Sequence, residues 1–272
     1  MSDLFDLRDK TIAITGGGGV LCSAMALALA KAGARIAILD LAEVAAAEVA
    51  EEIKSDGGLA IAVKCDVLDK KSLEAAKEEI NSVYGKIDIL INGAGGNKKE
   101  ATTSPDLSFF DLPSEALQFV FNLNFIGTLL PSQVFGKEMA ESGGGIILNI
   151  SSMCAFSPLT KIPGYSAAKA AVSNFTQWLA VHINQNYSKD VRVNAIAPGF
   201  FLTEQNRFLL TDEKTGELTA RGQTIIDHTP MGRFGQPEEL IGTAIWLLSD
   251  AAKFVTGIVV PVDGGFSAFS GV

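Results

Sequence analysis

Three residues of this chain, a serine, a tyrosine and a lysine, have the types and the spacing of an acid–base site. Ser152 follows an apolar stretch typical of a strand, and Tyr165 and Lys169 are four positions apart in a helical pattern downstream. Positions four apart share one face of a helix, so the Lys169 ammonium can lie beneath the Tyr165 ring and favour its phenolate. A free tyrosine titrates near ~10, and we expect this cation to lower that pKa. Tyr165 could then exchange a proton with a substrate oxygen to which Ser152 donates a hydrogen bond.

A serine hydrolase is a weaker interpretation of the same residues. The chain has only two histidines, His182 and His228, and neither is near Ser152 in the sequence. A Ser-His-Asp arrangement needs such a histidine as its base. The remaining alternative, a surface tyrosine and lysine on an ordinary helix, has to be weighed against the rest of the chain.

The N-terminal part of the chain has the pattern of a dinucleotide site. An apolar strand pattern over 11–15 runs into four glycines, residues 16–19, and a helical pattern follows over 20–32. Backbone amides and the helix dipole at such a junction can hold a pyrophosphate, although glycine runs also occur as plain turns. The next strand pattern, 35–39, is followed by Asp40, whose carboxylate can accept from the adenine-ribose hydroxyls and would repel the additional phosphate of NADP. We therefore predict NAD as the cofactor.

Taken together, these residues resemble the short-chain dehydrogenase/reductase family over nearly the whole chain. The glycine turn of that family corresponds to 15–22, its Asn-x-Ala-Gly motif to 92–95, and its catalytic set to Ser152, Tyr165 and Lys169. The resemblance also implies a catalytic role for Asn124. Cofactor contacts are implied for Gly16, Gly18, Gly19, Leu21, Asp40, Asp66, Val67, Asn92, Ala94, Tyr165, Lys169, Pro198, Gly199, Phe201 and Thr203.

Asn124 has two interpretations. Asparagine is locally unfavourable inside the helical run 113–139, so packing alone could tolerate an irregularity there. The resemblance implies instead that the irregularity frees a backbone carbonyl, which holds a water linking Lys169 to solvent. We favour the second interpretation.

The glycine turn departs from the family pattern at two positions. In ungapped register Val20 and Cys22 stand where the family usually has glycine, while Gly17, Gly18 and Gly19 fill its variable positions. Cys22 is small enough to let the helix approach the strand. We expect phosphate binding to be retained, with the role of each glycine other than Gly16 left open.

Four loop sequences give a narrower resemblance. The tracts 16–21, 92–97, 159–163 and 197–207 are similar to those of the D-mannonate oxidoreductases, also called fructuronate reductases. That branch implies interconversion of D-mannonate and D-fructuronate by hydride transfer to or from C4 of the nicotinamide, with Tyr165 handling the proton.

Three rival functions stay open at this point. A polyol or gluconate-type dehydrogenase would share every cofactor and catalytic residue. A 3-oxoacyl carrier-protein reductase would usually prefer NADP and a basic docking patch, which Asp40 and the net charge of −9 disfavour. A nucleotide-sensing protein without activity on the same fold would not need to keep Ser152, Tyr165 and Lys169.

The periodicity along the chain predicts the α/β fold class. Short apolar strands alternate with helical patterns, which is typical of a doubly wound, Rossmann-type parallel sheet of seven strands with helices on both faces. We expect one domain over residues 1–272. The predicted strands are 11–15, 35–39, 60–65, 88–92, 146–151, 191–196 and 257–262.

Composition excludes several other functions. The net charge of −9 disfavours a nucleic-acid partner, and no apolar run reaches the ~20 residues of a membrane span. The N-terminus lacks a signal-peptide pattern, so we expect a cytoplasmic protein. Three cysteines without Cys-x-x-Cys spacing and two isolated histidines indicate neither disulfides nor a metal site.

Two stretches exceed what the fold requires and are candidate lids, 96–111 and 204–235. Both follow strands at their carboxyl ends, where ligands bind in such sheets. The substrate is expected to be a small sugar acid whose reacting oxygen lies at Ser152 and whose carboxylate needs a cation or amide donors. The candidates are Lys161, our first choice, with Asn97 and Arg207, although each could also be solvated surface polarity.

The family's subunits commonly pair through helices equivalent to 113–139 and 163–187. Both stretches carry more large apolar residues than one core-facing stripe needs, unless all of them point inwards. The resemblance, which also implies pairing through the last strand, therefore implies a homotetramer. The residues concerned are Phe119, Phe121, Phe125, Phe135, Phe175 and Trp178.

Overall fold

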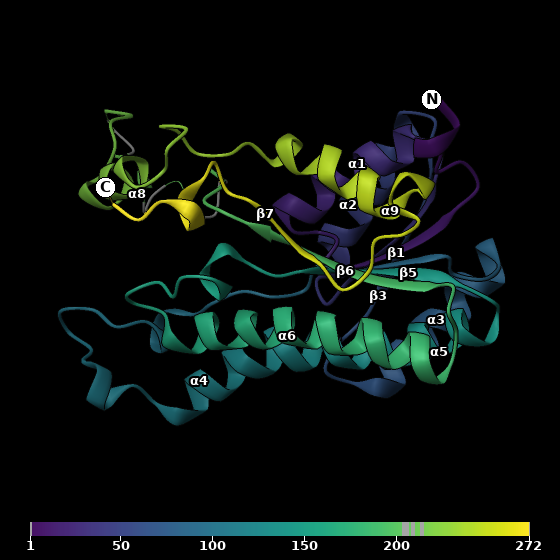
Figure 1. Cartoon of the computed structure of the whole chain (residues 1–272), viewed down its shortest axis with the longest axis horizontal. Coiled ribbons are helices and arrows are strands. Elements are labelled where there is room, and N and C mark those ends of the chain that lie inside the picture. The colour runs from purple at the N-terminus through teal and green to yellow at the C-terminus, as the bar shows by residue number, and fades with distance from the viewer. Residues whose placement is uncertain (1, 203–206, 208–209, 213–214, 272) are drawn as a thin grey trace.

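The seven predicted strands are all present and form one parallel sheet. The structure, a computed structural model, describes residues 2–202, 207, 210–212 and 215–271. The strand order is β3-β2-β1-β4-β5-β6-β7, so the sheet is doubly wound as predicted (Figure 1). Each strand end lies within two residues of its predicted position. The strands are β1 (Thr11–Thr15), β2 (Arg35–Asp40), β3 (Leu59–Lys64), β4 (Ile89–Asn92), β5 (Gly145–Ile150), β6 (Val191–Pro198) and β7 (Val259–Val262).

Helices cover both faces of the sheet, as Figure 1 shows. One layer consists of α1 (Val20–Lys31), α2 (Glu43–Ser55) and α9 (Ile241–Leu248). The other consists of α3 (Lys70–Tyr84), α5 (Gly127–Glu141) and α6 (Pro163–Asn186). A separate apolar core fills the space between the sheet and each layer. Strands buried on both faces explain why their sequences are continuous apolar runs rather than alternating ones.

Shorter helices complete the structure at the ends of the strands. In the part of the chain that the structure describes, they include the α-helices α4 (Ser114–Phe121) and α8 (Ala220–Asp227). The 3-10 helices are η1 (Ser2–Phe5), η2 (Lys99–Ala101), η3 (Phe109–Asp111), η5 (Met153–Ala155), η6 (Pro237–Leu240), η7 (Asp250–Ala252) and η8 (Phe266–Ala268).

The helical run predicted over 113–139 is interrupted at Asn124. A π-helical turn, η4 (Asn122–Ile126), joins α4 to α5, and Asn124 is fully buried within it. Its main-chain carbonyl accepts a hydrogen bond of 2.8 Å from Thr128 Oγ1. The irregularity that the sequence predicted is therefore a wide turn of the helix, of the kind often found at functional sites.

The two candidate lids lie at the carboxyl end of the sheet. Segment 96–111 contains η2 and η3, and the Thr103 amide donates to the Lys161 carbonyl at 3.0 Å. The described part of 204–235 contains α8 and packs around a small cluster formed by Leu210, Ile225 and Phe234. In Figure 1 this part lies at the end of the molecule opposite the N-terminus, next to the C-terminus. Lid movement remains a prediction.

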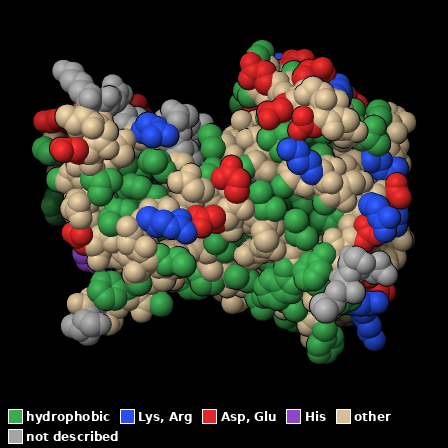
Figure 2. Space-filling view, turned by 90° about the horizontal axis from the view of Figure 1, so that it is seen from above, with side chains coloured by type: hydrophobic (Ala, Val, Ile, Leu, Met, Phe, Trp, Pro, Cys, Tyr) green, Lys and Arg blue, Asp and Glu red, His purple; other side chains and the backbone are tan. Residues whose placement is uncertain are grey.

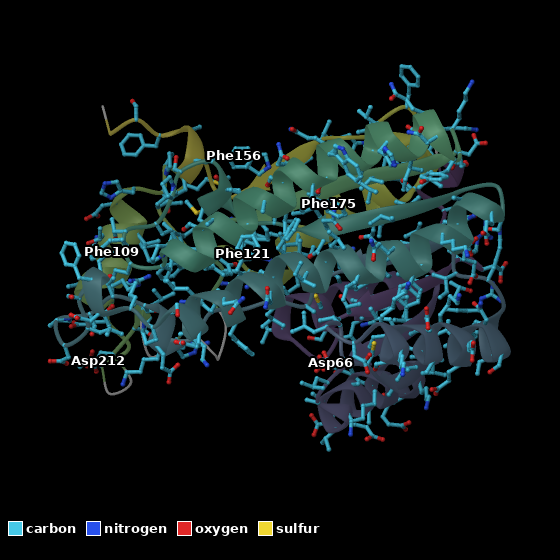
Figure 3. All side chains as sticks on the ribbon, turned by 90° about the horizontal axis from the view of Figure 1, so that it is seen from below. Asp66, Phe109, Phe121, Phe156, Phe175 and Asp212 are labelled. Carbon is cyan, nitrogen blue, oxygen red and sulfur yellow. The ribbon has the colours of Figure 1, made fainter. Side chains whose placement is uncertain are left out.

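Exposed aromatic side chains of α4 and α6 lie with half-buried rings of α4, η4 and α6. Of the rings that the sequence singled out, Phe135 is fully buried, whereas Trp178 is 54% and Phe119 47% exposed. Phe121, Phe125, Phe175 and Trp178 form a series of neighbouring rings with centroids 5.5 to 6.1 Å apart, and Figure 3 labels two of them on this face. The interpretation in which all rings point inwards is wrong.

Among the described residues, no helix combines the length and apolar character needed to cross a membrane. Within the same part of the chain, no group of three or more His, Cys, Asp or Glu side chains could hold a metal ion. Cys22, Cys65 and Cys154 are buried free thiols.

Candidate active site

The carboxyl ends of the central strands open into a cleft of about 500 Å³. Its walls come from the glycine turn after β1, the ends of β2, β4 and β5, α6 and the segment after β6. The sequence-predicted residues that line it are Gly16, Gly19, Leu21, Asp40, Asp66, Val67, Ala94, Ser152, Tyr165, Lys169, Pro198, Gly199 and Phe201. Ser152, Tyr165 and Lys169 are thus brought together at the same cleft as the glycine turn, as the spacing predicted.

The glycine turn is packed so closely that side chains would not fit. Gly16 has φ +63°, and a Cβ atom there would lie 2.7 Å from the Cα of Ala94. Gly18 lies behind the cleft surface, where its amide donates to Asp40 Oδ2 at 3.0 Å. No side chain caps the N-terminus of α1 at Gly19, so the first amides of that helix are available to an anion.

Cys22 is accommodated because Gly93 has no side chain. A Cβ atom on Gly93 would lie 2.1 Å from Cys22 Sγ, so the sulfur occupies the space that this glycine leaves between α1 and β4. Burial raises the pKa of the Cys22 thiol to about 12, and the group is therefore neutral at physiological pH. The close approach of helix and strand predicted from the size of Cys22 is present in the structure.

Asp40 is held at the carboxyl end of β2 by two backbone amides. Its Oδ2 accepts from Gly18 and its Oδ1 accepts from the Ala42 amide at 2.9 Å. These bonds fix the carboxylate against the glycine turn, on the cleft wall. A negative charge therefore has a defined position where the turn and β2 meet.

Lys169 is the most deeply buried cation of the site. It is 3% exposed, and its Nζ donates to the Ile150 carbonyl at 2.8 Å. The same nitrogen lies 5.6 Å from the centroid of the Tyr165 ring, on the face of α6 that both residues share. Burial lowers the pKa of Lys169 from 10.5 to about 8.

The expected shift of Tyr165 is wrong in direction. Burial raises the pKa of the Tyr165 phenol, the nearby Cys154 raises it further, and a hydrogen bond with the Ser152 hydroxyl lowers it by a smaller amount. The phenol packs against the small apolar cluster of Ala101, Ala116 and Val120. Desolvation and Cys154 together outweigh the hydrogen bond from Ser152, so Tyr165 is a neutral hydrogen-bond donor in this structure.

Ser152 lies at the start of η5 directly after β5. Its Oγ accepts from the Cys154 amide at 3.3 Å, which orients the hydroxyl at the cleft. Ser152 and the Tyr165 phenol line the same cleft, so two O–H groups are available on one side of it. Such a pair can donate to a single substrate oxygen.

Asn124 acts behind the cleft rather than in its wall. Its Nδ2 donates to the carbonyls of Gly96 and Val120, both at 2.7 Å, and its Oδ1 accepts from the Gly96 amide at 3.1 Å. A Cβ atom on Gly95 would lie 2.6 Å from Asn124 Oδ1 and 3.2 Å from Lys169 Nζ. Asn124 therefore fixes the 95–96 backbone directly against Lys169.

Asn92 is likewise a supporting residue. Its Nδ2 donates to Ser132 Oγ and to Asn149 Oδ1, each at 2.9 Å, within the buried network of β4 and β5. Its contact with a cofactor stays a prediction. Thr203 lies outside the described residues.

The predicted carboxylate candidates lie at different places. Lys161 lines a second pocket of about 490 Å³ that shares Phe200 with the cleft. Asn97 donates to Thr102 Oγ1 at 2.8 Å, and the Arg207 carbonyl accepts from the Thr211 amide at 2.7 Å. Neither Asn97 nor Arg207 is among the described residues that line the two pockets.

The second pocket also contains two basic residues that the sequence analysis did not single out as ligands, Arg221 and His228. Seven positions separate them, which is close to two helical turns and places both on one face of α8. That spacing was the available signal.

The fold and the site together define a dinucleotide-binding oxidoreductase. A family model described as enoyl-(acyl carrier protein) reductase matches residues 20–267. The chain belongs to the short-chain dehydrogenase/reductase family.

Individual relatives are similar over almost the whole chain. An uncharacterized oxidoreductase of Bacillus subtilis, UxuB, is 52% identical over 276 residues, which cover 98% of each chain. A crystal structure of a Haemophilus influenzae protein assigned as a D-mannonate oxidoreductase, with bound NAD, is 52% identical with a TM-score of 0.92 and covers 98% of each chain. The 5-keto-D-gluconate 5-reductase of Escherichia coli is 34% identical and covers 97% of this chain and 98% of its own.

Proposed function

We propose that this protein is an NAD-dependent oxidoreductase that interconverts D-mannonate and D-fructuronate. The observation that carries the proposal is the convergence of Ser152, Tyr165 and Lys169 on the cleft that also holds the glycine turn and Asp40. The 52% identical Haemophilus influenzae protein, assigned to this reaction and crystallised with NAD, supports the choice of substrate and cofactor.

The residues of the cleft fit a dinucleotide. The turn at Gly16 and the uncapped N-terminus of α1 would hold the pyrophosphate. Asp40 would accept from the adenine-ribose hydroxyls and disfavour a phosphate at that position, which supports NAD over NADP. Asp66 and Val67 line the same cleft and would contact the adenine, and Pro198, Gly199 and Phe201 also line it and would lie beside the nicotinamide. When bound, the oxidised cofactor would accept the hydride from the alcohol, and the reduced cofactor would donate it to the ketone.

The chain's own residues handle the proton. In ketone reduction the neutral Tyr165 phenol donates its proton to the substrate oxygen, while the Ser152 hydroxyl donates a hydrogen bond to the same atom. The raised pKa of Tyr165 keeps that proton in place before reaction. Lys169 lies beneath the ring and offsets the negative charge left on the phenolate.

Asn124 supports proton return. The π-helical turn and the bonds to Gly96 hold the main chain of 95–96 beside Lys169. In the proposed relay, a water at this turn connects Lys169 to solvent. Oxidation of D-mannonate runs through the same groups in reverse order.

A gluconate-type reaction is the second candidate. It is favoured by the 34% identity to the 5-keto-D-gluconate 5-reductase over nearly the full length of both chains. Both reactions interconvert a hydroxyl and a ketone on a six-carbon sugar acid, so they would use the same catalytic residues.

Initial rates of NADH oxidation distinguish the two candidates. The substrates are D-fructuronate, 5-keto-D-gluconate and other keto sugar acids, each tested with NADH and NADPH. We expect the highest kcat/KM with D-fructuronate and NADH. A higher value with 5-keto-D-gluconate would transfer the proposal to the second candidate, and inactivity towards every sugar acid would reject both.

A further inference from the structure

The second pocket, which contains Lys161, adjoins the cleft that Ser152 and Tyr165 line. One wall is segment 157–161, which leads from Ser152 towards Tyr165, and the facing wall is α8. Phe200 lines both this pocket and the cleft, and its ring packs edge-on against Phe266, with centroids 5.2 Å apart. In Figure 2 the molecule narrows between the end that carries α8 and the body formed by α1, α2 and α9.

The polar lining of this pocket is basic although the protein is acidic. Lys161, Arg221 and His228 line it, and none of the described residues along its wall is Asp or Glu. The chain as a whole has a net charge of −9. The local positive charge here would favour an anion despite the acidic balance of the chain, and the rings of Phe200 and Phe266 form an apolar part of the same wall.

Hydrogen bonds fix the Lys161 backbone and the His228 ring in this wall. The Lys161 carbonyl accepts from the Thr103 amide at 3.0 Å, which ties the loop to segment 96–111. His228 Nδ1 lies 2.8 Å from the Thr224 carbonyl, and because a carbonyl can only accept, Nδ1 carries the proton. The other ring nitrogen, Nε2, is then free of that bond and can contact a substrate hydroxyl or carboxylate.

Arg221 has the position and the chemistry of the principal anchor. It lies in the first turn of α8, where the helix dipole already adds positive potential, and that turn, which the structure describes completely, has no acidic residue. A bound anion would interact favourably with both the guanidinium and the positive end of the helix dipole. The planar guanidinium can also hold a carboxylate through two parallel hydrogen bonds, which the Lys161 ammonium cannot do.

We propose that this pocket binds the carboxylate of the sugar acid, with Arg221 as its anchor and Lys161 and His228 beside it. The inference rests on the proposed function. In D-fructuronate the carboxylate is at the end of the carbon chain farther from the ketone, so a ketone held at Ser152 and Tyr165 directs it past Phe200 towards α8. Arg221 and His228 thereby take the role that the sequence analysis gave to Arg207 and Asn97.

The test compares Arg221→Met and Arg221→Lys with Lys189→Met, which removes an exposed charge beyond the C-terminal end of α6. Calorimetry measures the Kd of D-mannonate in the presence of NADH. No reaction occurs in this mixture, because the alcohol and the reduced cofactor are both hydride donors. We expect Arg221→Met to weaken binding by about ten- to a hundredfold, the effect of losing a charge-assisted bond. Arg221→Lys should recover part of the loss, and Lys189→Met should bind as wild type does.

Kinetics provide the second measurement. The KM of D-fructuronate should rise in Arg221→Met, whereas the KM of its uncharged amide should stay within about twofold, because only the acid has a carboxylate to lose. Equal D-mannonate affinity in wild type and Arg221→Met overturns the inference, and so does the absence of D-mannonate binding by wild type. If wild type binds D-mannonate through Arg221 but does not reduce D-fructuronate, the anion pocket stands and the proposed reaction fails.

Discussion

Replacement of Lys169 by Met distinguishes the effect of this residue on the free energy of unfolding from its effect on turnover. The side chain is 3% exposed, and burial lowers its pKa from 10.5 to about 8. This lowering of the pKa corresponds to about 3 kcal/mol of destabilisation at pH 7, where the buried ammonium is still charged. Met has a similar length and no charge, so Lys169→Met removes this cost.

The lost hydrogen bond acts in the opposite direction. Lys169 Nζ donates to the Ile150 carbonyl at 2.8 Å, and removing a charged donor costs about 1.5–3 kcal/mol. The two effects nearly cancel, so we expect the free energy of unfolding at pH 7 to stay equal to that of wild type or to exceed it by about 1–2 kcal/mol. Turnover should nevertheless fall by about 10²-fold or more, because the phenolate of Tyr165 loses its neighbouring cation.

The pH dependence identifies the source of the difference. Between pH 8 and 10.5 the unfolded chain binds more protons at Lys169 than the folded chain does, so this residue makes wild type more stable as the pH rises. The free energy of unfolding of Lys169→Met minus that of wild type should therefore fall by about 2 kcal/mol between pH 7 and pH 9.5, so that wild type becomes the equally or more stable protein. The buried thiol of Cys65 titrates in both proteins and cancels in the comparison, whereas Cys22 and Cys154 interact electrostatically with Lys169 and contribute to the difference.

Urea denaturation at pH 7, 8 and 9.5, followed by circular dichroism, measures these differences. Lys137→Met, which removes an exposed charge on α5, is the matched control and should show no such pH-dependent change. A constant difference between wild type and Lys169→Met across this range would refute the assignment of the cost to a buried ammonium. A variant that is several kcal/mol less stable than wild type at pH 7 would show that the bond to Ile150 dominates.

Three further predictions concern the cofactor, the acid–base residue and the assembly. Tyr165→Phe should lower kcat by about 10²-fold or more in NADH-linked assays while the Kd of NADH stays nearly constant; turnover near the wild-type value contradicts the proposed mechanism. Asp40→Ala should lower the ratio of kcat/KM with NAD to kcat/KM with NADP. A wild-type enzyme that prefers NADP would show that Asp40 has another role. Light scattering should give a homotetramer that buries the exposed rings of Phe119 and Trp178, whereas a mass of one 28.6 kDa chain at micromolar concentration would contradict it.

The parts of this protein that the sequence predicted well are those with local or periodic signals. β1 is buried along its entire length, which produces the continuous apolar run 11–15, and the glycines that follow mark the turn to α1. The spacing of Tyr165 and Lys169 fixes their common face on α6 in the same way. In each case neighbouring residues alone determine the geometry.

The parts that the sequence could not predict depend on segments far away in the chain. Arg221 and His228 become neighbours of Lys161 only because α8 packs over Phe200, with Ile225, Leu210 and Phe234 as its core. Asn124 contacts Gly96 through a bond that spans 28 positions. No local pattern encodes either contact.

The pKa of Tyr165 shows why residue types and spacing alone gave the wrong direction. The sequence places a cation beside the phenol but not the cluster of Ala101, Ala116 and Val120 that desolvates it. The same burial lowers the pKa of Lys169, so both groups are shifted towards their neutral forms. A neutral phenol is ready to donate a proton to a ketone, whereas oxidation requires the phenolate. The positive charge of the oxidised nicotinamide favours that phenolate, so binding of the oxidised cofactor would itself prepare Tyr165 to act as a base.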